Sequence, residues 1–212
     1  MAWCHLCVPS FSNMTELRRK ALFTMKTLSW RVAAAGAPFA VRPCGACGAD
    51  AKFASTGLFR VNAQKKLVDV WLVYRCATCG SVWNSAVISR GSAKAVSKGR
   101  LERFLANDPD LALACALDAS LLRRNGARRG PVEFVVEGER YAGRDACRVD
   151  ITCEDALGLT VAHVLRRKLE VSRRELEQLV DAGRVSLADG GDVRTAKLGS
   201  QCTVILHADD GC

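Results

Sequence analysis

Two short cysteine motifs offer the clearest chemistry in the sequence. "CGAC" supplies Cys44 and Cys47, "CATC" supplies Cys76 and Cys79, and a glycine directly follows each motif. A CxxC turn places two thiolates on the same side of a tight loop. A glycine after the turn can take a positive φ, which leaves room for backbone N–H groups near the sulfur atoms. The 28 residues between Cys47 and Cys76 are enough for a β excursion out and back, so the two turns can meet.

Four thiolates suit zinc, a borderline-soft ion that accepts tetrahedral sulfur coordination without a redox change. We therefore expect structural Zn²⁺ in a zinc ribbon, bound by Cys44, Cys47, Cys76 and Cys79. Four protein ligands leave no position for water or substrate, so such a metal stabilises the fold and does not catalyse a reaction. The alternatives are four unligated core or redox cysteines, and iron in a rubredoxin-like site.

The chain has 11 cysteines, and this odd total argues against a complete disulfide framework. Cys4 and Cys7 form a third CxxC around His5, but a metal there would lack two ligands. The remaining cysteines are expected in the core, except for the last, which is expected to be exposed: Cys115, Cys147, Cys153, Cys202 and Cys212.

Charge is distributed unevenly along the chain. The net charge is +9, but residues 1–100 hold 15 Lys and Arg against 3 Asp and Glu, and residues 101–212 hold 16 against 19. A basic first half favours an anionic partner, nucleic acid before membrane, because no basic amphipathic helix with a bulky apolar face is evident. No apolar run approaches the roughly 20 residues needed to cross a bilayer, so a cytoplasmic protein is expected.

The periodicity of apolar residues predicts the helices and strands that must position these groups. Strands are expected over residues 57–63, 67–76 and 81–88. In 67–76 the even-numbered positions are apolar and the odd-numbered positions are mixed, which indicates one buried face. Residues 98–126 have helical spacing, with Asp108-Pro109 typical of a helix start.

The C-terminal half is expected to follow a simple order. A loop over residues 123–130 precedes a β hairpin formed by 131–138 and 147–153. Helices are expected over 154–170 and 172–183, and strands over 184–187 and 202–206 close the chain. Ser172 and Glu175 have the spacing of a capping box for the second helix.

Basic residues crowd around the junction of these two helices. A positive surface beside a helix N-terminus is where a phosphate backbone binds. The residues expected to contact RNA are Arg166, Arg167, Lys168, Arg173, Arg174 and Arg184.

The stretch over residues 157–206 resembles the αL RNA-binding motif, a two-helix module of a small-subunit ribosomal protein that recurs in pseudouridine synthases. Its matching residues are Leu165, Ser172-Arg173, Leu179-Val180, Gly183 and Val185. The resemblance implies RNA contacts from Arg173, Arg174 and Arg184.

Residues 43–206 as a whole resemble a bacterial family known as domain of unknown function 1062. The supporting segments include "FRVNA" from Phe59, "DVWLVYRC" from Asp69, Trp83-Asn84, "VEFVV" from Val132 and "VDITCEDALGLTV" from Val149, besides the cysteines. This resemblance implies a zinc ribbon followed by an αL-like part, without an established activity.

Together these features predict an α+β fold in four segments. Residues 1–42 are expected to form a flexible extension, 43–97 an antiparallel zinc ribbon, 98–130 a helical connector, and 131–212 a β hairpin with the αL-like helix pair and its own hairpin.

The expected function is that of a non-enzymatic, zinc-stabilised RNA-binding protein, associated with translation or the ribosome, with rRNA or tRNA as partner. Trp71 or Tyr74 could stack on a base. Five residues could extend the phosphate-binding surface: Lys52, Arg60, Lys65, Lys66 and Arg75.

The alternative is a protein-interaction or regulatory module that uses both folds as scaffolds. It is favoured by Gly158-Leu159-Thr160, which stands where the αL family carries Arg-Leu-Asp. Catalysis is not expected, because the histidines are only His5, His163 and His207 and no phosphate loop, nucleophile elbow or HExxH motif occurs.

Overall fold

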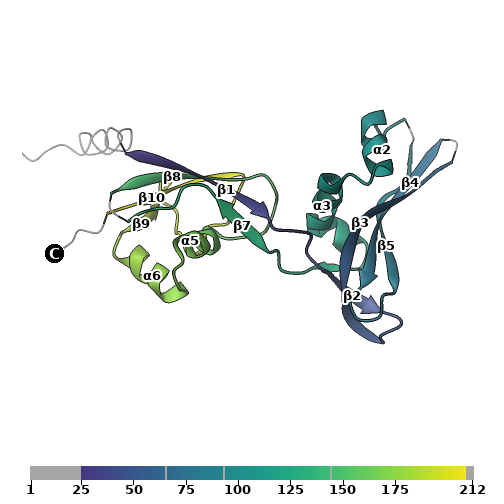
Figure 1. Ribbon diagram of the computed structural model, residues 1–212, viewed down its shortest axis with the longest axis horizontal. Helices are drawn as coiled ribbons and strands as arrows, with labels where there is room; N and C mark the ends of the chain where they lie inside the picture. The colour runs from purple at the N-terminus through teal and green to yellow at the C-terminus, as the bar shows by residue number, and fades with distance from the viewer. Residues whose placement is uncertain (1–24, 65, 93, 144, 209–212) are drawn as a thin grey trace, which may run out of the picture. The chain divides into compact units, whose positions relative to one another are not determined.

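The computed structural model describes residues 25–64, 66–92, 94–143 and 145–208 (Figure 1). It has an α+β fold with two five-stranded sheets. The chain forms two compact units, one made of residues 33–135 with 154–157, and the other of the remaining described residues. We call the first the ribbon unit and the second the helix-pair unit.

The sheet of the ribbon unit has the strand order β5-β4-β3-β2-β6, with antiparallel pairing throughout. Its strands are β2 (Ala40–Cys44), β3 (Ala49–Gln64), β4 (Leu67–Cys76), β5 (Val82–Ser92) and β6 (Arg128–Arg129). The three strands expected from the sequence are therefore confirmed, and β3 begins well before the segment that was expected.

Strand β4 has the alternation that its sequence predicts. Its even-numbered residues are buried and its odd-numbered residues are half-buried or exposed. Short helices cover the buried face: α2 (Lys98–Leu105), α3 (Pro109–Leu117) and α4 (Ala119–Arg124). Phe104 of α2 packs on Val68 and Val70, and Leu122 of α4 belongs to the same core as Leu72.

The helical segment is more broken than its periodicity suggests. Asp108 caps α3 and Pro109 begins it, as expected. A second cap then interrupts the apolar stripe, because the carboxylate of Asp118 accepts hydrogen bonds from the backbone N–H groups of Ser120 and Leu121. Residues 123–130 are also not one loop, since α4 extends to Arg124 and β6 follows.

The sheet of the helix-pair unit has the order β7-β1-β8-β10-β9. Its strands are β1 (Lys26–Ala34), β7 (Phe134–Glu137), β8 (Cys147–Cys153), β9 (Val185–Leu187) and β10 (Gln201–Leu206). Helices α5 (Val161–Leu169) and α6 (Arg173–Asp181) lie together against one side of this sheet (Figure 1). The closing β9–β10 hairpin is antiparallel, as expected.

Two expectations for this unit are corrected. Residues 131–138 and 147–153 do not form a hairpin, because β1 lies between β7 and β8 and pairs with β8 in parallel. The flexible extension expected over 1–42 contains β1, whose Leu28, Trp30 and Val32 are buried. Residues 1–24 lie outside the described part of the chain. The parallel partner of β1 is more than a hundred residues away, so local periodicity could not show it.

The helix expected to begin at Glu154 begins instead at Val161. Gly158 has a φ of 74°. Thr160 then caps α5 in a reciprocal capping box with His163. The connector expected as a separate segment is likewise part of the ribbon unit, because its helices supply more than a third of the buried residues in that unit's core clusters.

Asp108 gives this fold an acid-sensitive element. Its carboxylate accepts two hydrogen bonds from Arg103, at 2.8 and 3.1 Å, and one from the N–H of Leu111. The Arg103 guanidinium, followed by the Leu111 N–H, lowers the pKa of Asp108 to about 2. An aspartate pKa is about 3.9 in an unfolded chain, so this stabilisation is present above about pH 4 and is lost as the pH falls toward 2.

We predict that Asp108→Asn, which retains a capping oxygen but not the charge, lowers the free energy of unfolding at neutral pH. The difference from wild type should shrink as the pH falls from about 4 to about 2. Chemical denaturation at several pH values measures this, with Glu133→Gln, an exposed carboxylate, as the control. A difference that does not change with pH would contradict the assignment.

Candidate functional site

The two cysteine turns lie at the same end of the ribbon sheet. Cys44 ends β2 and Cys76 ends β4, while Cys47 and Cys79 lie in the turns that lead into β3 and β5. Each turn is closed by an identical hydrogen bond of 2.9 Å, from the N–H of the following glycine to the carbonyl of the first cysteine. These glycines have φ values of 70° and 75°, so the positive φ expected from the sequence is confirmed.

The four sulfur atoms converge to within 4.8 Å of one another. The Sγ atoms of Cys44 and Cys79 are 3.6 Å apart, and those of Cys47 and Cys76 are 3.9 Å apart. A tetrahedron with zinc–sulfur bonds of about 2.3 Å has sulfur–sulfur edges of roughly 3.8 Å. A disulfide needs about 2.05 Å, and all four thiols are free. The cluster is therefore compatible with a metal site such as zinc.

The second turn favours thiolates through its hydrogen bonds. The hydroxyl and the backbone N–H of Ser81 donate to the Cys79 sulfur and lower the pKa of this thiol to about 6. Backbone N–H groups of Cys79 and Thr78 likewise lower the pKa of Cys76. Hydrogen bonds between the Cys47 thiol and neighbouring sulfurs, of which the one to Cys79 has the largest effect, raise the pKa of Cys47 to about 12. A divalent cation would replace the shared protons.

Ser81 is a functional neighbour that the sequence analysis missed. Its hydroxyl lies 3.1 Å from the Cys79 sulfur. A hydroxyl residue two positions after the last cysteine of a CxxC turn is a signal that could have identified it.

The remaining cysteines lie apart from the cluster. Cys115, Cys147 and Cys153 are buried, as expected, and Cys202 is half-buried. The third CxxC with its histidine lies outside the described residues, as does the last cysteine: Cys4, His5, Cys7 and Cys212.

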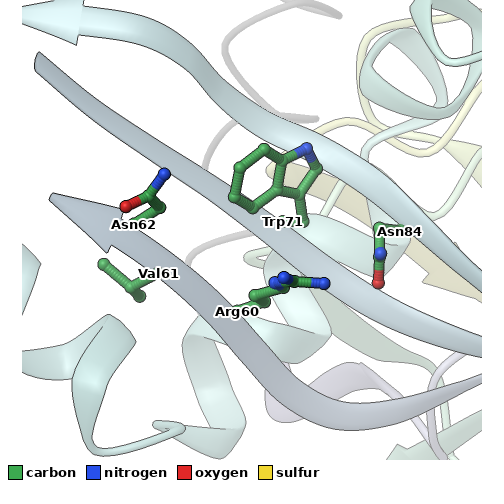
Figure 2. A pocket seen from close by; sticks show the side chains of 5 residues that line it. All are labelled: Arg60, Val61, Asn62, Trp71 and Asn84. Atoms are coloured by element: carbon green, nitrogen blue, oxygen red, sulfur yellow. The ribbon is translucent and has the colours of Figure 1, made fainter. Parts of the chain in front are cut away.

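The two aromatic candidates on β4 have opposite environments. Tyr74 has no exposed surface, and burial raises the pKa of its hydroxyl, so it does not offer a stacking surface. Trp71 lies on the other face, where it lines an open hollow of about 590 Å³ together with Arg60, Val61, Asn62 and Asn84 (Figure 2). Of the additional basic candidates, Lys52, Lys66 and Arg75 are exposed, and Lys65 lies outside the described residues.

The basic residues of the helix-pair unit lie where the sequence places them. Arg166, Arg167 and Lys168 are in the last turn of α5. Ser172 and Glu175 form the expected capping box, which places Arg173 and Arg174 in the first turn of α6. Arg184 directly precedes β9 and is half-buried.

Two of these residues are occupied by partners within the protein. Lys168 donates to the backbone carbonyls of Val136 and Gly138, at 3.1 and 2.7 Å, and so connects α5 to the edge strand β7. Arg173 pairs with Glu177 one turn later, at 2.9 Å. Lys168 therefore has a structural role that its charge alone did not indicate.

Three arginines at the same junction have no such partner. Within the residues that the structure describes, the guanidinium groups of Arg166, Arg167 and Arg174 form no ion pair. The buried Nε of Arg166 has no hydrogen-bond acceptor. Arg166 lines a hollow of about 270 Å³ that also includes Thr160, His163 and Arg173. Uncompensated positive charge thus gathers where α5 ends and α6 begins.

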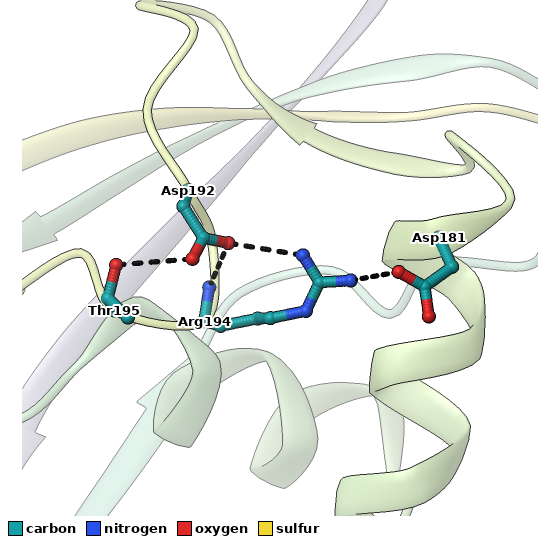
Figure 3. A network of polar contacts seen from close by, with 4 residues as sticks. All are labelled: Asp181, Asp192, Arg194 and Thr195. Atoms are coloured by element: carbon teal, nitrogen blue, oxygen red, sulfur yellow. Dashed lines mark hydrogen bonds and ion pairs between the residues drawn. The ribbon is translucent and has the colours of Figure 1, made fainter.

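A further arginine beside this hollow is fully compensated (Figure 3). Arg194, in the loop after β9, donates to Asp181 of α6 and to Asp192, which lies two residues before it. Thr195 also donates to Asp192, at 3.2 Å. This network holds the loop against α6. The carboxylates of Asp181 and Asp192 neutralise the charge of Arg194, so this arginine is not a free cation. Asp181 and Arg194 are 13 residues apart, so no local sequence pattern indicates their contact.

The cysteine cluster leads to a prediction about metal stoichiometry. Purified protein should contain one tightly bound metal ion per chain. Cys47→Ser and Cys76→Ser should each lose the metal and most of the soluble protein, because structural zinc contributes on the order of 10 kcal/mol or more to folding. Metal analysis of purified preparations measures this, with Cys202→Ser as a control that should keep its metal. Folded wild-type protein without metal would show that the cluster is not a metal site.

Comparisons with curated proteins and with solved structures give no match. No helix within the described residues is long and apolar enough to span a membrane. One protein family does match, over residues 61–190. The matched region contains the second cysteine turn, Trp71 with Asn62 and Asn84 of the open face, and both helices of the pair, whereas Cys44, Cys47 and Arg60 precede it. The chain therefore belongs to the family described as "Protein of unknown function (DUF1062)".

Proposed function

We propose that this chain is a non-enzymatic RNA-binding protein, associated with translation or the ribosome, whose ribbon unit is held by structural Zn²⁺. The observation that carries the proposal is the group of uncompensated arginines at the junction of α5 and α6. Many other arginines of the described chain are paired with carboxylates or carbonyls, for example Arg103, Arg128 and Arg129. Cations without internal partners are suited to an external polyanion.

Zinc is the metal that best suits the cysteine cluster. The donor set is four sulfurs, and the Cys44–Cys79 and Cys47–Cys76 separations of 3.6 and 3.9 Å lie on either side of the edge length of a zinc-centred tetrahedron. Backbone and hydroxyl donors around Cys76 and Cys79 stabilise negative charge on the sulfurs. With Cys44, Cys47, Cys76 and Cys79 all bound, the ion has no open position, so it would act on folding and not on a substrate. In this interpretation β2–β5 form a zinc ribbon.

The helix-pair unit supports RNA as the polyanion. Two short capped helices followed directly by a strand reproduce the order expected for an αL-like motif. The first turn of α6 combines Arg174 with backbone N–H groups that have no acceptor among the described residues, and Arg166 and Arg167 lie one turn before the junction. A phosphate backbone binds such a positive helix start through charge-assisted hydrogen bonds. rRNA and tRNA are the proposed partners.

A protein-interaction module is the second candidate, and the carboxylate networks favour it. Arg140, Arg173 and Arg194 are already paired with acidic residues of the same unit, which lowers the potential available to RNA. A pull-down after nuclease treatment distinguishes the two functions. Stoichiometric recovery of one protein would favour the module, and loss of all partners on nuclease treatment would favour RNA.

The proposal predicts a strong effect of charge reversal at the junction. Arg167→Glu/Arg174→Glu should weaken binding to structured RNA and reduce the slope of log affinity against log salt by about 1 to 2, since each lost phosphate contact removes roughly 0.7 to 0.9. Fluorescence anisotropy at several salt concentrations measures both quantities.

Lys94→Glu/Lys98→Glu is the matched control, because it changes the net charge equally at two exposed positions on the ribbon unit. It should alter the salt slope much less than the junction variant. No detectable binding of structured RNA by zinc-loaded wild-type protein at low salt would end the proposal.

A further inference from the structure

The open face of the ribbon sheet is a second place where the molecule presents unsatisfied polar groups. On this face Trp71 occupies the central strand of β5-β4-β3, with Arg60 directly opposite it on β3 and Ala86 directly opposite it on β5. Asn62 and Asn84 are its diagonal neighbours on these two strands, a separation of about 7–8 Å in antiparallel sheets. One indole is thus surrounded by a guanidinium and two amides, all from rigid strands (Figure 2).

None of these groups is used within the described chain. The indole N–H of Trp71, the guanidinium of Arg60 and the amides of the two asparagines make no hydrogen bond or ion pair with described residues. Two other asparagines of the same unit show the contrast. The side-chain oxygen of Asn107 accepts from the N–H of Phe59, and Asn125 bonds both the N–H and the carbonyl of Ala86. Amides in this unit are thus bonded where they serve the fold.

These bonded asparagines fix the strands that carry the hollow. Asn107 holds β3 at Phe59, directly beside Arg60, and Asn125 holds β5 at Ala86, directly opposite Trp71. The pairing of β3 with β4 is irregular between Ser55 and Phe59, and that of β4 with β5 is irregular at Trp71. Bulges of this kind re-aim side chains and are common beside binding sites. The helices α2, α3 and α4 with their loops, which we call the helix layer, therefore hold the open face in one shape.

The hollow is large enough for a ligand. Its volume is about 590 Å³, within the range of small-molecule sites. Its lining combines one large aromatic surface with a cation and two donor–acceptor amides, rather than a continuous apolar patch. An aromatic ring beside polar groups of this kind suits a planar ligand with hydrogen-bonding edges and a nearby negative charge.

The charge of residues 40–92 indicates which kind of planar ligand suits the hollow. Residues 40–92 hold seven Lys and Arg against two acidic residues. Both acids have a partner within the protein, since Asp50 pairs with Arg128 and Asp69 accepts a hydrogen bond from the N–H of Arg90. Arg75 lies farther along the same face, between Ala54 and Val82. Toward Arg75 the positive charge of this face thus continues beyond one ligand, as a chain of phosphates requires, whereas Asp69 adds a carboxylate on the other side, opposite Asn62.

We propose that this face binds unpaired nucleotides of an RNA strand, with one base stacked on Trp71. The Arg60 guanidinium binds a phosphate, and Asn62 and Asn84 bind the hydrogen-bonding edges of the stacked base or its neighbour. The strand continues toward Arg75. This inference rests on the proposed function, because it names the part of the RNA that the ribbon unit recognises and the residues that recognise it.

Binding of a mixed-sequence single-stranded RNA of about 12 nucleotides to the zinc-loaded full chain tests the proposal. Trp71→Ala should lower the affinity by roughly 5- to 150-fold, the range for loss of one stacked base. Trp71→Phe should restore most of it, because the smaller ring still stacks. Metal content and circular dichroism should equal those of wild type in both variants, since Trp71 is not a core residue.

Tryptophan fluorescence supplies a second readout. RNA should quench the emission of wild type and of Trp30→Phe, in which the altered tryptophan is buried, whereas Trp71→Phe should bind RNA with little quenching. Unchanged RNA affinity of Trp71→Ala, with quenching that persists in Trp71→Phe, would overturn this site and leave the arginine junction standing.

Two further results would also overturn the site. The first is equal affinity for mononucleotides and for the RNA strand, which would indicate a site for free nucleotides. The second is failure of wild type to bind either single-stranded or structured RNA, which would reject the proposed function along with it.

Discussion

The meeting of two cysteine turns is the constraint on which the ribbon unit depends. The turns connect β2 to β3 and β4 to β5. The four sulfur atoms lie within 4.8 Å of one another, and this requires that β2, β3, β4 and β5 pair in the register that places both turns at the same end of the sheet. The helices that cover the sheet have 8, 9 and 6 residues, too few to be stable in isolation. They fold on a surface that the strands provide, and a metal ion that fixes the turns would stabilise the helix layer as well.

A metal ion bound by all four thiolates would have no open position for a substrate, so we propose that the function lies on the surfaces that the cluster organises. The buried face of β4 supplies the core and the opposite face presents Trp71. The hydrogen bonds of Asn107 and Asn125 connect the helix layer to the strand positions beside Arg60 and opposite Trp71, and so fix these positions. In the helix-pair unit the capping boxes of α5 and α6 have the corresponding role, because they fix the starts of the two helices that carry Arg167 and Arg174. Both units thus hold, on rigid elements, cations that have no partner within the described part of the chain.

The features that the sequence predicted are those encoded by nearby residues. The CxxC turns with their glycines, the helix start at Asp108-Pro109 and the capping box at Ser172 each depend on residues within a few positions of one another. The alternation in β4 also separates Trp71 from Tyr74, because Tyr74 shares the even-numbered register of the apolar positions.

The features that could not be predicted depend on distant partners. The place of β1 beside β8 is set by parallel pairing between segments more than a hundred residues apart. Lys168 has the same charge as its neighbours, and only the tertiary structure brings it to two carbonyls of the β7 edge. Charge density along the sequence therefore groups these cations together but does not separate those that the described residues bind from those that they leave free.

The most direct test of this account is to map where RNA touches the zinc-loaded protein. Ultraviolet crosslinking in cells, followed by mass spectrometry of the nucleotide-bearing peptides, locates each contact without prior choice of an RNA. The account predicts crosslinks on the β4 peptide that contains Trp71 and on the peptides of the α5–α6 junction that contain Arg167 and Arg174. Absence of crosslinked RNA, or crosslinks confined to other peptides, would contradict it.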